Sequence, residues 1–113
     1  MQVQVNTSHD IHGSQKFHEF VQTEIEAALE RFAPHLTRVE VHFTDENGDK
    51  EIGEDKRCVI EARPAGAPPV SVTHMAGSVD LALEGAAEKM GRLLEARFGK
   101  LHSAKGGVPT RDV

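Results

Sequence analysis

Four short segments in which apolar and polar residues alternate are the feature that most constrains the fold. Their apolar positions are Val3 and Val5, then Val39, Val41 and Phe43, then Cys58, Ile60 and Ala62, and finally Val70 and Val72. This period-two pattern predicts strands with one buried face. Because each strand has only one apolar side, any helices in the chain must pack on the same side of the sheet.

Two longer segments show helical spacing instead. Apolar residues recur every three or four positions from Phe17 to Phe32, behind a capping Ser14 and ahead of Pro34, which ends the helix. A second apolar stripe runs from Val79 to Leu101 behind Ser78 as its cap. These patterns predict two amphipathic helices.

The predicted order is strand, helix, three strands, helix. A helical crossover makes the first two strands parallel, and short connections make the later pairs antiparallel. The charged run 45–55, with its Asn-Gly turn signal, is expected to form a long hairpin connection. We therefore predict an α+β fold, β-α-β-β-β-α, with a four-stranded mixed sheet and two helices packed on one face. The open face would carry Gln2, Gln4, Glu40, His42, Arg57, Glu61, Arg63, Ser71 and Thr73.

The 113 residues suffice for one domain with a modest core. We place this domain at residues 1–102 and expect a flexible C-terminal tail at 103–113, which contains Gly-Gly and Pro. The first residues have neither the basic flank nor the apolar run of a signal peptide, and no stretch has the length of a membrane span. A cytoplasmic protein is expected.

Few residues suggest catalysis or metal binding. Cys58 is the only cysteine and is expected in the core, where a thiol is inert. His9 and His12 have a spacing that could share an ion, but Asp10 and His18 complete no known zinc or iron pattern. Nucleotide-binding loops and nucleophile motifs are absent from the sequence. We predict no enzyme activity, no metal, no cofactor and no small-molecule substrate.

Charge is unevenly distributed along the chain. The net charge is −5, yet residues 1–55 carry 4 basic and 12 acidic side chains, whereas residues 56–113 carry 9 basic and 6 acidic ones. One explanation is that basic residues late in the second helix complement its dipole. The other is that Lys89, Arg92, Lys100 and Lys105 form a stripe that faces phosphates.

The second helix resembles the last helix of the ribosome hibernation promoting factor family, also called ribosome-associated inhibitors or ribosomal subunit interface proteins. The matching residues are Ala82, Glu84-Gly85, Glu88-Lys89-Met90, Arg92, Leu94 and Lys100-Leu101, with Glu19-Phe20-Val21 and Phe32 in the first helix. The strand and helix order is similar as well. The resemblance covers residues 1 to about 102, and we expect a short form, without the C-terminal dimerisation domain of long members.

The resemblance implies a binding module that lodges in the small ribosomal subunit, in the channel used by messenger and transfer RNA, and keeps idle ribosomes inactive. Basic residues on the helices of such proteins grip ribosomal RNA phosphates. Lys89, Arg92 and Lys100 fall on basic positions of the family's second helix. With the open sheet face added, the expected RNA-binding residues are Lys89, Arg92, Arg97, Lys100, Arg57 and Arg63.

The first helix departs from the family pattern. His18, Glu24 and Ala27 stand where relatives place basic residues, and Glu26 and Glu30 are nearby. In the second helix, Ala96 and Phe98 replace further basic positions. Because like charges repel, an acidic helix is a poor phosphate contact. Two hypotheses follow from this departure. Either ribosome binding uses only the second helix and the open sheet face, or the chain is an acidic protein-binding regulatory module that kept the fold and lost ribosome affinity.

Overall fold

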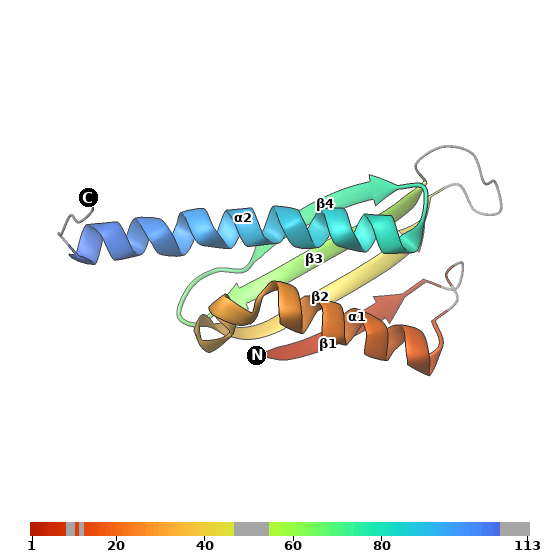
Figure 1. Ribbon diagram of the computed structural model, residues 1–113, viewed down its shortest axis with the longest axis horizontal. Helices are drawn as coiled ribbons and strands as arrows, with labels where there is room; N and C mark the ends of the chain where they lie inside the picture. The colour runs from red at the N-terminus through yellow and green to blue at the C-terminus, as the bar shows by residue number, and fades with distance from the viewer. Residues whose placement is uncertain (9–10, 12, 47–54, 107–113) are drawn as a thin grey trace.

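The computed structural model describes residues 1–8, 11, 13–46 and 55–106, with side chains as far as residue 99. One four-stranded sheet in the order β1-β2-β3-β4 carries two long helices (Figure 1). The elements are β1 (Gln2–Thr7), α1 (Gln15–Ala28), the 3-10 helix η1 (Glu30–His35), β2 (Leu36–Asp45), β3 (Lys56–Pro64), β4 (Val70–Ala76) and α2 (Val79–Gly106). The predicted β-α-β-β-β-α fold is confirmed.

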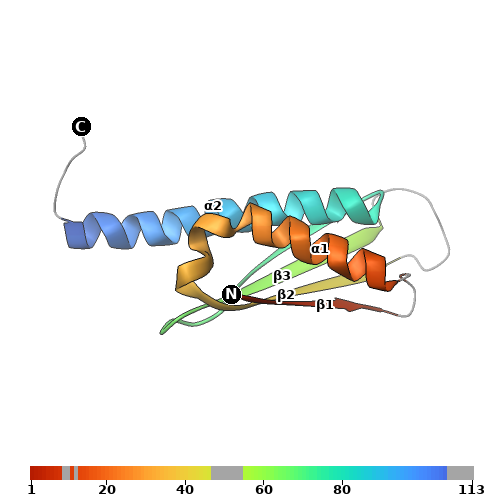
Figure 2. The same ribbon diagram turned by 60° about the horizontal axis from the view of Figure 1, so that its bottom comes forward.

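Strand pairing brings the apolar positions of all four strands onto one face. β1 runs parallel to β2, whereas β2 with β3 and β3 with β4 are antiparallel. Val41, for example, lies between Val5 on β1 and Ile60 on β3. Both α-helices cover this apolar face, as Figure 2 shows, and the opposite face stays uncovered. The one-sided alternation of the strands explains this arrangement.

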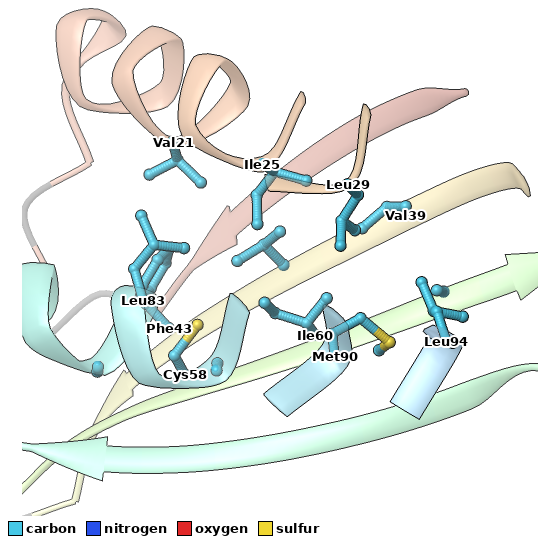
Figure 3. Packing of buried hydrophobic residues seen from close by; sticks show 14 of the residues in the cluster. Val21, Ile25, Leu29, Val39, Phe43, Cys58, Ile60, Leu83, Met90 and Leu94 are labelled. Carbon is cyan, nitrogen blue, oxygen red and sulfur yellow. The ribbon is translucent and has the colours of Figure 1, made fainter. Parts of the chain in front are cut away.

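The core fills the space between the helices and the sheet (Figure 3). Its largest fully buried side chains include Ile25 and Leu29 before β2, Phe43 and Ile60 in the sheet, and Met90 in α2. Removing such a side chain from water contributes about 1.5–3 kcal/mol. Both predicted caps are present: the Ser14 Oγ accepts from the Phe17 amide at 3.1 Å and the Ser78 Oγ accepts from the Leu81 amide at 3.2 Å.

Three element ends differ from the prediction. α1 ends at Ala28, and η1 contains Pro34, so the expected single helix as far as Phe32 is wrong in its last turn. Pro34 cannot donate an α-helical hydrogen bond and its ring would clash with the preceding turn, so a tighter helix replaces the end of α1.

The other two differences lengthen elements. β4 extends to Ala76, because its last residues still pair with β3 although their side chains do not continue the apolar alternation. α2 continues to Gly106, so residues 103–106 of the expected tail are helical, and residues 107–113 lie outside the described residues. No helix in the described part of the chain combines the length and the apolar character of a membrane span.

Candidate functional site

The predicted contact residues fall into two groups on opposite sides of the sheet. The α2 group is Lys89, Arg92, Arg97 and Lys100, and the β3 group is Arg57 and Arg63. The two β3 arginines alternate with the buried positions of their strand and therefore point to the open face, away from the helices. No single flat surface contains all six residues.

Within α2, Lys89 and Arg92 differ in how strongly they are held. The Lys89 Nζ donates to the main-chain carbonyl of Thr73 at 2.8 Å, which ties the side chain to the edge strand β4. Arg92 pairs with Glu88 one helical turn earlier at 3.0 Å, and both side chains are about two-thirds exposed, at 72% and 65%. Both cations are exposed, but only Lys89 is tied to the main chain of another element.

The second half of α2 is anchored to η1 by aromatic packing. The Phe98 ring lies 5.8 Å from the Phe32 ring and 5.1 Å from the His35 ring, measured between centroids. Arg97, beside Phe98, is exposed and forms no ion pair with any residue whose side chain the structure describes. Lys100 follows on the same helix, and its side chain lies outside the described residues. Phe98 therefore holds this end of α2 where Arg97 is accessible.

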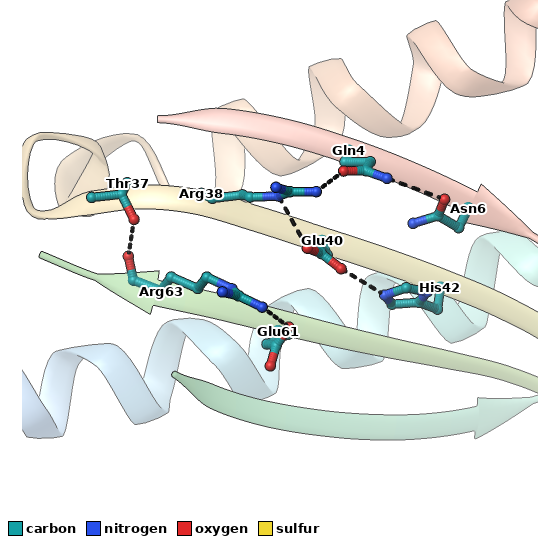
Figure 4. A network of polar contacts seen from close by, with 8 residues as sticks. All are labelled: Gln4, Asn6, Thr37, Arg38, Glu40, His42, Glu61 and Arg63. Atoms are coloured by element: carbon teal, nitrogen blue, oxygen red, sulfur yellow. Dashed lines mark hydrogen bonds and ion pairs between the residues drawn. The ribbon is translucent and has the colours of Figure 1, made fainter. Parts of the chain in front are cut away.

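A network of polar side chains covers the open sheet face (Figure 4). The Glu40 carboxylate forms an ion pair with the Arg38 guanidinium at 3.0 Å and lies 3.2 Å from the His42 ring. Arg63 pairs with Glu61 at 3.5 Å. The described arginines on this face each have a carboxylate neighbour, so the face is close to electrically balanced.

Arg38 is a basic residue of the open face that was not among the predicted contact residues. It pairs in register with Arg63 of β3 and with Gln2 of β1, and its side chain donates to Gln4. Its position directly before the Val39 alternation could have shown that it faces outward.

Arg38 and Arg63 lie at the end of the sheet toward which α2 extends its second half (Figure 1). We call the cations at this end, the exposed Arg63 and Arg97 and the half-buried Arg38, the basic end.

Arg57 lies at the opposite end of β3, away from the basic end. Its guanidinium is 3.9 Å from the carboxylate of Glu46. The neighbouring Lys56 Nζ donates to the Asp55 carboxylate at 3.0 Å and lies 3.4 Å from the Asp45 carboxylate. The hydrogen bond to Asp55 raises the pKa of Lys56, although burial alone would lower it. These carboxylates make the Arg57 end of the sheet less favourable for phosphate.

A groove follows α2 and is bordered by α1 and η1 and, through His74, by β4. Its lining includes Phe20, Glu24 and Arg31 of α1 and η1 and Leu81, Glu84 and Glu88 of α2. Small residues, among them Ala28, Ala87 and Gly91, also line it and leave room between the helices. We call this feature the inter-helix groove. Its charged residues are mainly carboxylates, in contrast to those of the basic end.

Reactive side chains are scarce in the described part of the chain. Cys58 is fully buried, and burial raises the pKa of its thiol to about 12, so the thiol stays protonated at neutral pH. Among the described residues, no three His, Cys, Asp or Glu side chains gather to hold a metal ion. His9, Asp10 and His12 lie outside the described residues, whereas His18 is half-buried on α1.

The fold and these surfaces define a small α+β domain with an open polar sheet face and a long, partly basic C-terminal helix. The family model described as sigma 54 modulation protein / S30EA ribosomal protein matches residues 4–102, so the chain belongs to this family of ribosome-associated factors. This result confirms the resemblance drawn from the sequence.

Solved structures support the fold. The chain is similar to the Protein Y N-terminal domain of Thermus thermophilus, with a TM-score of 0.67 and 16% identity over 87% of this chain and 99% of that one. It is equally similar to a ribosomal subunit interface protein from Coxiella burnetii, with a TM-score of 0.67 and 11% identity over 88% and 99% of the two chains. No curated protein matched the chain.

Proposed function

We propose that this protein is a cytoplasmic translational regulator that binds the small ribosomal subunit, contacts ribosomal RNA phosphates in the messenger and transfer RNA channel, and keeps idle ribosomes inactive. The family match over residues 4–102 is the observation that carries the proposal. The role is one of binding and requires no enzyme activity or cofactor.

The basic end is the surface best suited to RNA. Phosphate binding is driven by Lys and Arg side chains that displace condensed counterions. Arg97 is exposed without an ion-pair partner among the described side chains, and Arg38 and Arg63 lie at the same end on the open face. Lys100, one turn of α2 beyond Arg97, is proposed to add a further contact.

Arg92 and Lys89 would extend this contact along α2. The exposed pair between Arg92 and Glu88 is worth only about 0.3–0.5 kcal/mol, so Arg92 can exchange its carboxylate for a phosphate at little cost. Lys89 already has a partner in the Thr73 carbonyl. We therefore expect Arg92 to contribute more to RNA affinity than Lys89.

The outer surface of α1 is the part of the domain least suited to RNA. Its exposed acidic residues are Glu19, Glu24 and Glu26, and Glu30 follows at the start of η1. These carboxylates would repel a phosphate backbone. Of the two alternatives raised by the sequence, we propose ribosome binding without α1, through the accessible cations of α2 and the basic end.

Cosedimentation with purified small subunits tests the proposal. The wild-type protein is expected to sediment with the subunit at low salt, and Arg97→Glu should bind more weakly. The slope of log K against log salt should be less steep by about one in Arg97→Glu than in the wild type. Adding Arg92→Glu should reduce the slope by about one more.

Lys16→Glu is the matched control, because it makes the same charge change at an exposed position of α1. A wild-type protein that stays at the top of the gradient at low salt would contradict the proposal. An equal loss in Lys16→Glu and Arg97→Glu would show that only net charge matters.

A further inference from the structure

We propose that the inter-helix groove is a docking site for a basic amphipathic segment of a partner protein. This inference goes beyond the ribosomal RNA contact, because it concerns a partner of the opposite charge and a surface that shares only Lys89 and Arg92 with that contact. The groove is lined by residues of both helices, η1 and β4, whereas Arg38 and Arg63 of the basic end belong to the open face of the sheet.

The charge of the groove selects a cationic occupant. Five carboxylates line it, those of Glu24, Asp80, Glu84, Glu88 and Glu95, against three basic side chains. All three basic groups have partners: Arg31 pairs with Glu95, Arg92 with Glu88, and Lys89 with the Thr73 carbonyl.

The remaining carboxylates are unbalanced. Glu24, Asp80 and Glu84 have no ion-pair partner among the described side chains. Next to these three carboxylates a phosphate backbone would be repelled, whereas Lys or Arg side chains of a partner would be attracted to them.

Exposed apolar side chains at the groove indicate that the occupant also has an apolar face. Phe20 of α1 is 44% exposed and Leu81 of α2 is 55% exposed, and both line the groove. Large apolar side chains left in water next to an acidic rim are typical of a surface that receives an apolar anchor.

Farther along, the ion pair between Arg31 and Glu95 joins η1 to α2 across the groove. A segment with one apolar stripe and flanking cations, such as an amphipathic helix, fits the part near Phe20 and Leu81.

A synthetic helical peptide with a Leu stripe and Lys on its other faces is a suitable probe, and its binding to the full chain can be followed by fluorescence anisotropy. Glu24→Gln with Glu84→Gln should weaken binding about tenfold, which corresponds to about 1.4 kcal/mol. Phe20→Ala should also weaken it, whereas a scrambled peptide of the same composition should bind less tightly to the wild type.

Glu26→Gln with Glu30→Gln is the matched control, because it removes the same charge outside the groove. Three outcomes would each overturn the docking site. They are an equal loss of peptide affinity in the two double variants, no peptide binding by the wild type at low salt, and displacement of the peptide by a single-stranded RNA. The Glu24→Gln, Glu84→Gln variant is expected to keep its affinity for small subunits, and the Arg97→Glu variant is expected to keep its affinity for the peptide. Failure of one proposal is therefore distinguishable from failure of the other.

Discussion

At the scale of single residues, the contact between Gly85 and His74 shows why α2 needs a glycine near its start. His74 faces inward from β4, and α2 passes over it at Gly85. A Cβ atom built on Gly85 would lie 2.1 Å from the Cδ2 of His74, so the ring occupies the space of a side chain. The Glu-Gly step that supported the family resemblance thus has a packing explanation.

Gly85→Ala is expected to destabilise the protein. Alanine gains about 1 kcal/mol of helix propensity over glycine, but overpacking against the His74 ring costs about 1–3 kcal/mol. Gly91→Ala is the control in the same helix, because a Cβ there meets nothing within 4 Å, and it should stabilise by about 1 kcal/mol. Urea unfolding of both variants measures these changes.

The double variant His74→Ala with Gly85→Ala isolates the contact. If the ring causes the loss, the double variant should be more stable than the sum of the two single changes predicts. Additive effects would show that Gly85 is not needed to accommodate His74.

At the scale of elements, α2 is long for the sheet that it covers. Its 28 residues correspond to about 42 Å of helix, whereas β4 beneath it has 7 residues. The second half of α2 depends on η1 for support, through the contact of Phe98 with Phe32 and His35. The 3-10 turn that replaces the end of α1 thereby positions the helix segment that carries Arg97.

Phe98→Ala is expected to loosen this segment and leave the rest of the fold intact. Phe98 is half-buried, so the loss should be about 1–2 kcal/mol, less than the 3–5 kcal/mol typical of a fully buried phenylalanine. Hydrogen exchange should show lower protection from residue 97 to residue 106, with unchanged protection near Met90. Unchanged exchange throughout α2 would contradict a supporting role for Phe98.

At the scale of the whole molecule, charge is separated by location. Cations are accessible on α2 and at the end of the sheet near Arg63, whereas carboxylates gather in the inter-helix groove and around Arg57. This separation lets a chain of net charge −5 present a basic surface and an acidic surface at the same time.

Arg63→Gln and Arg57→Gln test the basic end as a surface of the whole molecule. Both residues are exposed on β3 and point to the open face, but only Arg63 lies at the end of the sheet toward which the second half of α2 extends. We expect Arg63→Gln to weaken small-subunit binding severalfold, because an exposed single contact contributes about 1 kcal/mol or less. Arg57→Gln should have less effect, because Arg57 lies outside the basic end. Equal losses, measured by cosedimentation, would show that RNA lies along the whole strand.

The fold was largely predictable from local patterns, whereas the site was predictable only in part. The period of apolar residues specified the sheet and both helices, since a one-sided strand has to bury its apolar face. The end of α1 was not predicted, because Leu29 and Phe32 keep helical spacing although Pro34 forces a 3-10 turn. The predicted contact residues were chosen by charge, and charge along a sequence does not reveal which cations already have partners.

The sequence by itself determined the β-α-β-β-β-α order, the buried face of each strand and the family. These depend on periodicity and local propensity, which neighbouring residues carry. Only the tertiary structure decided that Lys89 is tied to β4, that Arg38 joins Arg63, and that the carboxylates of two helices meet in one groove. Those features arise from residues far apart in the chain, and strand pairing and helix packing bring them together.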